Sequence, residues 1–124
     1  MKNYLRAVLL FSALNLTFSN MSQSLAQQPH IVGGYQAANK SDQNVVSAAK
    51  FAVNKERLKH GGRVSLISIE RAETQVVAGI NYRLCLRVKR NGKTQNVATV
   101  VYQNLQQRYS LSSWQKVASC KIPS

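Results

Sequence analysis

Residues 80–89 alternate strictly between apolar and polar side chains, and this pattern constrains the fold more than any other feature of the sequence. Every even position holds a branched aliphatic residue or a tyrosine, and the odd positions hold polar or charged residues and one cysteine. Successive side chains of a β-strand point to opposite faces, so the pattern predicts a strand with one buried and one solvated face. Asn91-Gly92 follows at once, and this pair is a strong signal for a two-residue hairpin turn.

The segments on either side of this hairpin also have the character of strands. Residues 63–74 are rich in branched apolar residues with polar ones between them, and the alternation shifts near Leu66-Ile67, which predicts a β-bulge. Residues 94–102 return from the Asn-Gly turn, and a last strand is expected between residues 109 and 122. The order predicts an antiparallel meander of four or five strands.

One helix is predicted before the strands, from residue 41 to about residue 58. Ser41 or Asp42 can cap its first turn, and Gly61-Gly62 can end it. Its apolar residues recur at the spacing of one helix face. They are Val45, Ala48, Ala49, Ala52 and Val53. One helix packed on an antiparallel meander is an α+β fold.

The N-terminal residues 1–26 read as a secretory signal peptide rather than as part of the domain. Lys2 and Arg6 precede a short apolar run, and Ser24-Leu25-Ala26 offers the small residues that a signal peptidase requires. We therefore expect a single domain over residues 27–124, with no transmembrane segment. The protein is expected to be secreted, to the extracellular space or to the periplasm of a bacterium.

The chain is strongly basic, with 17 Lys and Arg residues against 4 Asp and Glu. Without the two cations of the signal peptide, the net charge is +11, which attracts anionic partners. Nucleic acid is not an expected partner of an exported protein. A solvated, charged sheet face is the simpler interpretation of cations that are spread along strands.

Cys85 and Cys120 are the two cysteines, and an even count in an exported protein favours a disulfide. Cys85 falls on the polar side of its strand, and the last strand should run two strands away, about 9 to 10 Å across the sheet. That separation exceeds the roughly 7 Å that a disulfide can bridge. Pairing therefore requires Cys120 to lie beyond the last strand, in a tail that folds back. Two unpaired thiols are the alternative.

Catalysis is not expected, and neither a metal nor a cofactor is predicted. After the signal peptide the chain has two histidines, His30 and His60, and both lie beside Pro or Gly segments. The sequence contains no HExxH, no CxxC and no Gly-rich phosphate loop.

The stretch Gln75-Val76-Val77-Ala78-Gly79 lies where the chain must reverse between two strands. Hairpin turns favour Gly, Asn, Asp and Pro, and only Gly79 belongs to that set. Three apolar side chains would then be displayed at a hairpin tip, where they gain nothing unless a partner covers them. Such an exposed apolar patch on a rigid support predicts a binding site.

This stretch, QVVAG, resembles the first binding loop of the cystatins, which inhibit papain-like cysteine proteases. Val32-Gly33-Gly34 is similar to the glycine-bearing N-terminal trunk of that family, and residues 49–53 are similar to the helix signature of plant cystatins. Trp114 is similar to the tryptophan of the second binding loop. The resemblance covers about residues 31 to 120.

The resemblance implies a cystatin-like fold and a reversible, competitive, non-covalent inhibitor with papain-like cysteine proteases as partners. It implies that Ile31 and Val32 enter the cleft of the protease, and that Gly33 and Gly34 let the trunk turn away from the attacking thiolate. Residues 75–79 would cover the catalytic cysteine. A monomer is expected, with a domain-swapped dimer as the alternative.

The second loop departs from the cystatin pattern, because Ser113 stands where the family has proline and Trp114 comes late. Two placements follow. Trp114 caps a long loop over residues 103–113, or the loop tip is residues 105–108 and Trp114 lies in the last strand. The loop placement is slightly favoured, so Trp114 is grouped with the protease-binding residues.

An alternative function follows from the charge. The cystatin fold also occurs in the pro-regions of cathelicidins, and a chain of charge +11 could bind anionic membrane surfaces or polyanions instead of a protease. The sequence contains no amphipathic basic helix that would favour this alternative.

Overall fold

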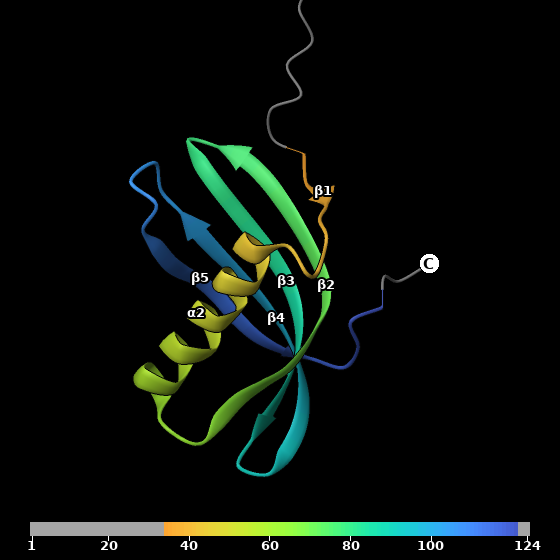
Figure 1. Ribbon diagram of the computed structural model, residues 1–124. Helices are drawn as coiled ribbons and strands as arrows, with labels where there is room; N and C mark the ends of the chain where they lie inside the picture. The colour runs from red at the N-terminus through yellow and green to blue at the C-terminus, as the bar shows by residue number, and fades with distance from the viewer. Residues whose placement is uncertain (1–33, 122–124) are drawn as a thin grey trace, which may run out of the picture. The chain divides into compact units, whose positions relative to one another are not determined.

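The computed structural model describes residues 34–121, which form one helix packed on a five-stranded antiparallel sheet (Figure 1). The elements are β1 (Gln36–Ala37), α2 (Gln43–His60), β2 (Val64–Val77), β3 (Gly79–Arg90), β4 (Lys93–Gln103) and β5 (Tyr109–Val117). The strands lie in the sheet in chain order. The predicted α+β fold with one helix on a meander is confirmed. Among residues 34–121, no helix combines the length and the apolar character needed to cross a membrane.

The helix begins and ends for reasons that are visible in the sequence. The Asp42 carboxylate accepts hydrogen bonds from the backbone N–H groups of Asn44, at 2.8 Å, and of Val45, at 3.3 Å. These bonds satisfy two of the N–H groups that a first helical turn leaves without a partner. At the other end Gly61 adopts φ 69°, and its N–H donates to the Arg57 carbonyl at 2.9 Å. Helix α2 therefore runs two residues beyond the predicted end.

The core lies between one face of α2 and one face of the sheet. Ala48, Ala49 and Ala52 are fully buried, and their small side chains let the helix lie close to the strands. Figure 1 shows α2 lying across one face of the sheet. The strands supply the bulk of the core with Tyr82, Leu84, Leu86, Val88, Val97 and Val101. The alternation of residues 80–89 thus separates a buried face from an open one, as predicted.

The local irregularities of the sheet also follow the sequence. The register between β2 and β3 shifts between Leu66 and Ser68, which confirms the predicted bulge, and shifts again between Ile69 and Arg71. In the β3–β4 turn Asn91 has φ 51° and Gly92 has φ 83°, the left-handed pair that a two-residue hairpin requires.

Cys85 and Cys120 form a disulfide, with their Cα atoms 5.6 Å apart. Cys120 lies three residues beyond the end of β5, so the tail folds back over the open face of the sheet. The amide of Asn96 also holds the tail, through a hydrogen bond to the Ala118 carbonyl at 3.3 Å. The geometric condition that the sequence set for pairing is met, and the predicted disulfide is confirmed.

Glu56 is a buried carboxylate on α2, 6% exposed, that the apolar helix pattern did not reveal. Its two oxygens bind Arg90 at 2.9 Å and His60 at 3.1 Å. Arg90 also donates to the Gly61 carbonyl at 3.4 Å, so one residue of β3 anchors the end of the helix. A buried charge without partners would be costly, and here both oxygens are satisfied.

Replacing both cysteines with serine should lower the free energy of unfolding by about 4 kcal/mol, since the disulfide closes a long loop of the unfolded chain. Urea unfolding followed by circular dichroism measures the loss. Cys85→Ser and Cys120→Ser alone should each cost about as much as the double variant, because either one removes the same bond. Additive losses would show that the bond is not the source of the stability.

Candidate functional site

The first candidate loop is the turn between β2 and β3, which consists of Ala78 alone because Val77 pairs with Gly79. Val76 is 70% exposed, Ala78 is exposed, and Val77 is half-buried. Gln75 lies below the tip, where its side-chain oxygen accepts a hydrogen bond from Asn81 at 2.9 Å. The structure therefore places an apolar tip where the sequence predicted one, with Val77 partly covered.

Gly79 fixes this turn against the end of β4. Its φ is 115°, a conformation that favours glycine, and it is buried. A Cβ atom here would collide with the Gln103 carbonyl oxygen and would lie 2.8 Å from the Tyr102 hydroxyl. That hydroxyl donates a hydrogen bond to the Ala78 carbonyl. The tip is thus pinned to the neighbouring hairpin and is preformed.

The second loop connects β4 to β5 and is organised by Asn104. The side-chain oxygen of Asn104 accepts hydrogen bonds from the N–H groups of Gln106, at 3.0 Å, and Arg108, at 2.9 Å. Its own N–H donates to the Arg108 carbonyl at 2.9 Å, and Gln107 adopts φ 64°. These bonds close a tight turn. The loop displays Leu105, which is 73% exposed.

The favoured placement of Trp114 in this loop is wrong. Trp114 lies within β5, opposite Thr99 of β4, and packs partly buried against the core. The register between β4 and β5 shifts at Val100, and Thr99 donates a hydrogen bond to the Ser113 carbonyl at 2.6 Å. The tight turn at Asn104 starts β5 early enough to include Trp114. The second placement, with the tip at residues 105–108, is correct.

A groove of about 450 Å³ lies between the two loops. It is lined by Asn44, Val76, Val77, Gly79, Ile80, Tyr82, Gln103, Asn104, Leu105 and Gln107. Tyr82 supports it from the core, and its hydroxyl donates to the Gln103 side-chain oxygen at 3.0 Å. Burial raises the pKa of Tyr82, and Tyr109 and Asp42 add to the rise, so the hydroxyl keeps its proton as a donor.

The third candidate segment is the trunk that leads into β1. Gln36 pairs with Thr74 and Ala37 with Glu73, so the antiparallel register directs the preceding residues towards the first loop. Figure 1 shows this segment and both loops at the same end of the sheet. Gly34, the first described residue, is exposed. The candidate residues Ile31, Val32 and Gly33 lie outside the described residues.

A chain of charged and aromatic contacts holds the trunk, and sequence reasoning missed it. The Glu73 carboxylate accepts two hydrogen bonds from Arg83, both at 3.0 Å. It also forms an ion pair with Arg71 at 3.2 Å. The Arg83 guanidinium in turn lies 3.8 Å from the centre of the Tyr35 ring, a cation–π contact. The register runs without a bulge from the turn to the pair of Glu73 and Arg83, but the sequence did not reveal that this turn consists of Ala78 alone.

The Glu73 pair also perturbs both of its pKa values. The hydrogen bond from Arg83 lowers the pKa of Glu73, against the opposing effect of burial, and the charges of Arg83 and Arg71 lower it further. The same hydrogen bond raises the pKa of Arg83. Both groups therefore stay charged across the neutral range.

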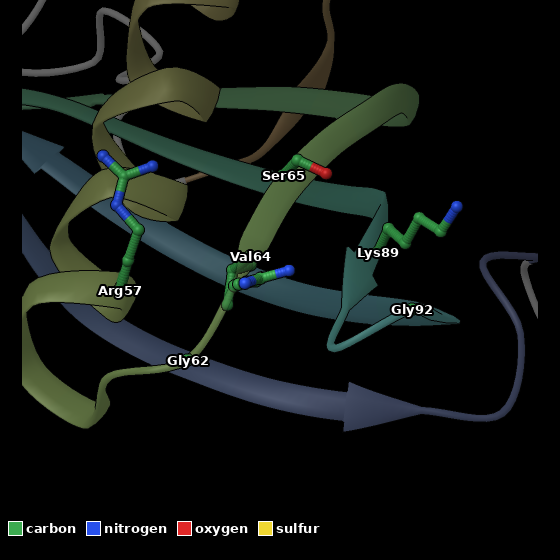
Figure 2. Close-up of a pocket in the computed structure, with 7 residues that line it drawn as sticks. Arg57, Gly62, Val64, Ser65, Lys89 and Gly92 are labelled. Carbon is green, nitrogen blue, oxygen red and sulfur yellow. The ribbon is translucent and has the colours of Figure 1, made fainter.

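A second pocket, of about 430 Å³, lies at the far end of the sheet and contains none of the candidate residues. It is lined by Arg57, Gly62, Arg63, Val64, Ser65, Lys89 and Gly92 (Figure 2). In the part of the chain that the structure describes, no group of three or more His, Cys, Asp or Glu residues is placed to hold a metal.

The family model for SQAPI, described as "Aspartic acid proteinase inhibitor", matches residues 37–117. Salivary cystatin-L2 of the tick Ixodes scapularis is 28% identical over an alignment 109 residues long, and the match covers 70% of this chain and 83% of the relative. Cystatin-1 of Zea mays is 33% identical over an alignment 88 residues long, and the match covers 68% of this chain and 65% of the relative.

Solved cystatin structures share the fold. A salivary cystatin of the soft tick Ornithodoros moubata superposes with a TM-score of 0.62 at 20% identity, over 70% of this chain and 99% of its own. Mialostatin, a gut cystatin of the hard tick Ixodes ricinus, superposes with a TM-score of 0.61 at 16% identity, over 69% of this chain and 99% of its own.

The chain therefore belongs to the proteinase-inhibitor family of the SQAPI model, within the cystatin superfamily. Members of the cystatin family are protease inhibitors and not enzymes, which confirms the prediction that the chain has no catalytic activity.

Glu73→Gln should lower stability at pH 7 by about 1 kcal/mol, the scale of a well-formed ion pair near the surface. The pKa of Glu73 is lower folded than unfolded, so the stabilisation is present above the unfolded value of about 4.3 and disappears as the pH falls through the folded value. Urea unfolding of both proteins from pH 7 to pH 2 should therefore show the difference shrinking below about pH 4.

Glu70→Gln is the matched control for this charge change. Glu70 is exposed, and the described residues give it a hydrogen bond from Ser68 but no ion pair. Its effect on stability at pH 7 should be small, because the exposed carboxylate forms no ion pair within residues 34–121. A Glu73→Gln difference that stays constant down to pH 2 would contradict the role given to the ion pair.

Trp114→Ala should lower the free energy of unfolding by about 2 kcal/mol or more, because Trp114 packs against the core. Leu105→Ala should change it by less than about 0.5 kcal/mol, because Leu105 is 73% exposed. Denaturant unfolding of the two variants compares them. Equal stability of Trp114→Ala and the parent would mean that Trp114 does not pack against the core and lies in an exposed loop.

Proposed function

We propose that the protein is a reversible, competitive and non-covalent inhibitor of papain-like cysteine proteases. The observation that carries the proposal is the pair of preformed hairpin loops with exposed apolar tips, Val76 and Ala78 on one and Leu105 on the other. Both lie at the end of the sheet towards which the trunk runs. Membership of the cystatin superfamily supports the same function.

In this proposal the first loop covers the catalytic cysteine of the protease and keeps substrate out. Nothing in the loop offers a reactive group, so no covalent bond forms. Covering a side chain such as Val76 is worth about 1.5 to 3 kcal/mol. Because Gly79 and Tyr102 hold the loop in place, little conformational entropy is lost on binding.

Leu105 takes the place of Trp114 as the apolar contact of the second loop. It stands across the groove from Val76, on a turn that Asn104 fixes with two side-chain hydrogen bonds. Trp114 then acts through the stability of β5 and not through contact with the protease. A single leucine buries less surface than a tryptophan, so more of the affinity depends on the first loop and the trunk.

The trunk is the third contact, and its role follows from the cystatin resemblance. Ile31 and Val32 would bind in the unprimed side of the protease cleft, and Gly33 and Gly34 would let the chain turn away from the thiolate. The contact between Arg83 and Tyr35 supports this role because it fixes the base from which the trunk starts.

The proposal includes export, with residues 1–26 removed as a signal peptide and residues 27–124 acting as a secreted monomer. The disulfide between Cys85 and Cys120 supports export, because such bonds persist in oxidising compartments.

Aspartic proteases are a second candidate target class, favoured by the description of the matching family model. An apolar tip such as Val76 can bind in the cleft of either class. The QVVAG sequence of the first loop favours cysteine proteases as the main target.

Titration of active papain and of pepsin with the exported protein tests both targets. Sub-micromolar, competitive and reversible inhibition of papain is expected, on the scale of about −8 kcal/mol or better. Inhibition of pepsin alone would mean that the two loops and the trunk bind aspartic proteases instead. No inhibition of either enzyme at tens of micromolar, by a protein with the circular dichroism of an α+β fold, would overturn the proposal.

Val76→Asp should weaken papain inhibition by about thirtyfold or more, because binding would bury an unpaired carboxylate at a cost of at least about 2 kcal/mol. Stability should not change, since Val76 is 70% exposed. Leu58→Asp makes the same change on a side chain of similar exposure, 74%, on the last turns of α2. This control should inhibit papain normally. Equal losses in both variants would mean that charge, and not the loop, is responsible.

A further inference from the structure

A shallow hollow of about 370 Å³ lies on the open face of the sheet, under the C-terminal tail. It is lined by Lys40, Glu70, Arg87, Asn96, Ser119, Cys120 and Lys121. The tail that forms one wall is held by the disulfide, by the bond from Asn96 to the Ala118 carbonyl, and by the Ser119 hydroxyl oxygen, which accepts from the Lys121 N–H at 3.1 Å. These contacts fix the position of the tail and therefore the shape of the hollow.

Cations outnumber carboxylates in this hollow. Within residues 34–121, Lys40, Arg87 and Lys121 form no ion pair with any carboxylate. Glu70 is the opposing charge, and it accepts a hydrogen bond from the Ser68 hydroxyl at 3.2 Å. The hollow therefore keeps a net positive charge. The other acidic groups of the described chain do not neutralise it. The Asp42 carboxylate accepts hydrogen bonds from the first turn of α2 and forms no ion pair within residues 34–121. Glu56 is buried with Arg90 and His60, and Glu73 is held by Arg71 and Arg83.

The positive charge continues along β3 beyond the hollow. Lys89 lies two residues after Arg87 on the same face, about 7 Å further along the strand. Its register partner is Ser65, and Figure 2 shows Ser65 and Lys89 pointing to the side away from α2. Arg57 lies on α2 and not on this face of the sheet (Figure 2). The cations Lys40, Arg87, Lys89 and Lys121 are called the basic face below.

The disulfide completes this face. Cys85 interrupts the cations of β3 at the position before Arg87, and its bond to Cys120 brings the exposed Lys121 over that gap. Lys121 lines both the hollow around Arg87 and a neighbouring one around Arg83 and Cys85. The bond therefore adds a cation to the face as well as stability to the fold.

We propose that the basic face binds a linear sulfated polysaccharide. A row of cations spaced along a strand matches a ligand that carries anionic groups at intervals along its length. The Asn96 amide and the Ser119 hydroxyl lie among the cations and can bind sugar hydroxyls. The cations continue beyond the hollow to Lys89, whereas a site for a single small anion would gather them around one point.

The lining argues against two other polyanions. Single-stranded nucleic acids stack their bases on exposed aromatic rings, and no aromatic residue lines the hollow. Arg83 already covers the Tyr35 ring nearby. Surfaces that insert into membranes add exposed apolar residues to their cations, and the large exposed hydrophobic residues of the described chain, Leu58, Ile67, Val76 and Leu105, all lie outside the hollow.

The loop tips Val76, Ala78 and Leu105 are called the proposed inhibitory edge below. The basic face is separate from this edge, and the two inferences do not depend on each other. Arg87 lies eight residues along β3 from Gly79, which is about 27 Å in a strand. One molecule could therefore bind a polysaccharide and a protease together. The sequence presented polyanion binding as an alternative to inhibition, and this geometry makes the two compatible.

Binding of a size-defined heparin oligosaccharide to the exported protein, measured by calorimetry at about 150 mM salt, tests the proposal. Arg87→Gln/Lys89→Gln should weaken binding by about tenfold or more, the scale of two lost contacts between a cation and an anionic surface. Lys50→Gln/Lys55→Gln removes the same charge from the exposed side of α2 and should weaken it by less than about threefold. Equal losses of heparin affinity in the two variants would mean that binding depends only on net charge, and this would overturn the proposal.

Lys121→Gln and Cys85→Ser/Cys120→Ser test the contribution of the tail. Both should weaken heparin binding, by about threefold or more, while papain inhibition by Lys121→Gln stays unchanged. Chemically desulfated heparin should not bind. Equal or tighter binding of single-stranded DNA, or of vesicles containing phosphatidylserine, would contradict the proposal and would make that polyanion the preferred ligand of the basic face. Because Arg87 and all the substituted lysines are exposed, the glutamine variants should fold as the parent does.

Discussion

The close packing of α2 on the sheet is the constraint on which the other features depend. The helix offers alanines to the sheet, and the sheet fills the space with Leu84, Leu86 and the valines of two strands. A larger residue at Ala48 or Ala52 would push the helix away and open the core. Because the buried face is settled by this contact, the register of β3 is fixed, and with it the position of every side chain on the open face.

The fixed register determines what each end and face of the sheet displays. The chain reverses at Ala78, and Gly79 lets the turn approach β4 so closely that the Tyr102 hydroxyl reaches the Ala78 carbonyl. The apolar tips therefore project from a rigid base. On the open face the same register aligns Arg83 with Glu73, which holds the trunk, and leaves Arg87 and Lys89 without carboxylate partners among residues 34–121.

The sequence was sufficient where a local pattern decides the structure. Alternation, the Asn-Gly turn and the apolar helix stripe predicted the elements. The position of Cys85 on the open face predicted that it can pair only with a Cys120 that lies beyond the last strand. Sequence reasoning failed at Trp114, because the length of the β4–β5 loop depends on the hydrogen bonds of Asn104, which no periodicity reveals. The Tyr35–Arg83 contact was missed for a similar reason: it joins segments far apart in the chain, and the register that brings them together depends on a turn that consists of Ala78 alone.

The distribution of charge explains how one small sheet can carry two surfaces. The proposed inhibitory edge displays valine, alanine and leucine, so its contacts with a protease would depend on the loss of water and change little with salt. The basic face depends on charges that salt screens over about 8 Å at physiological ionic strength. With about 27 Å of strand between Arg87 and Gly79, the field of the basic face is weak at the loops. A polyanion should therefore concentrate the protein near its surface without altering the affinity of the loops.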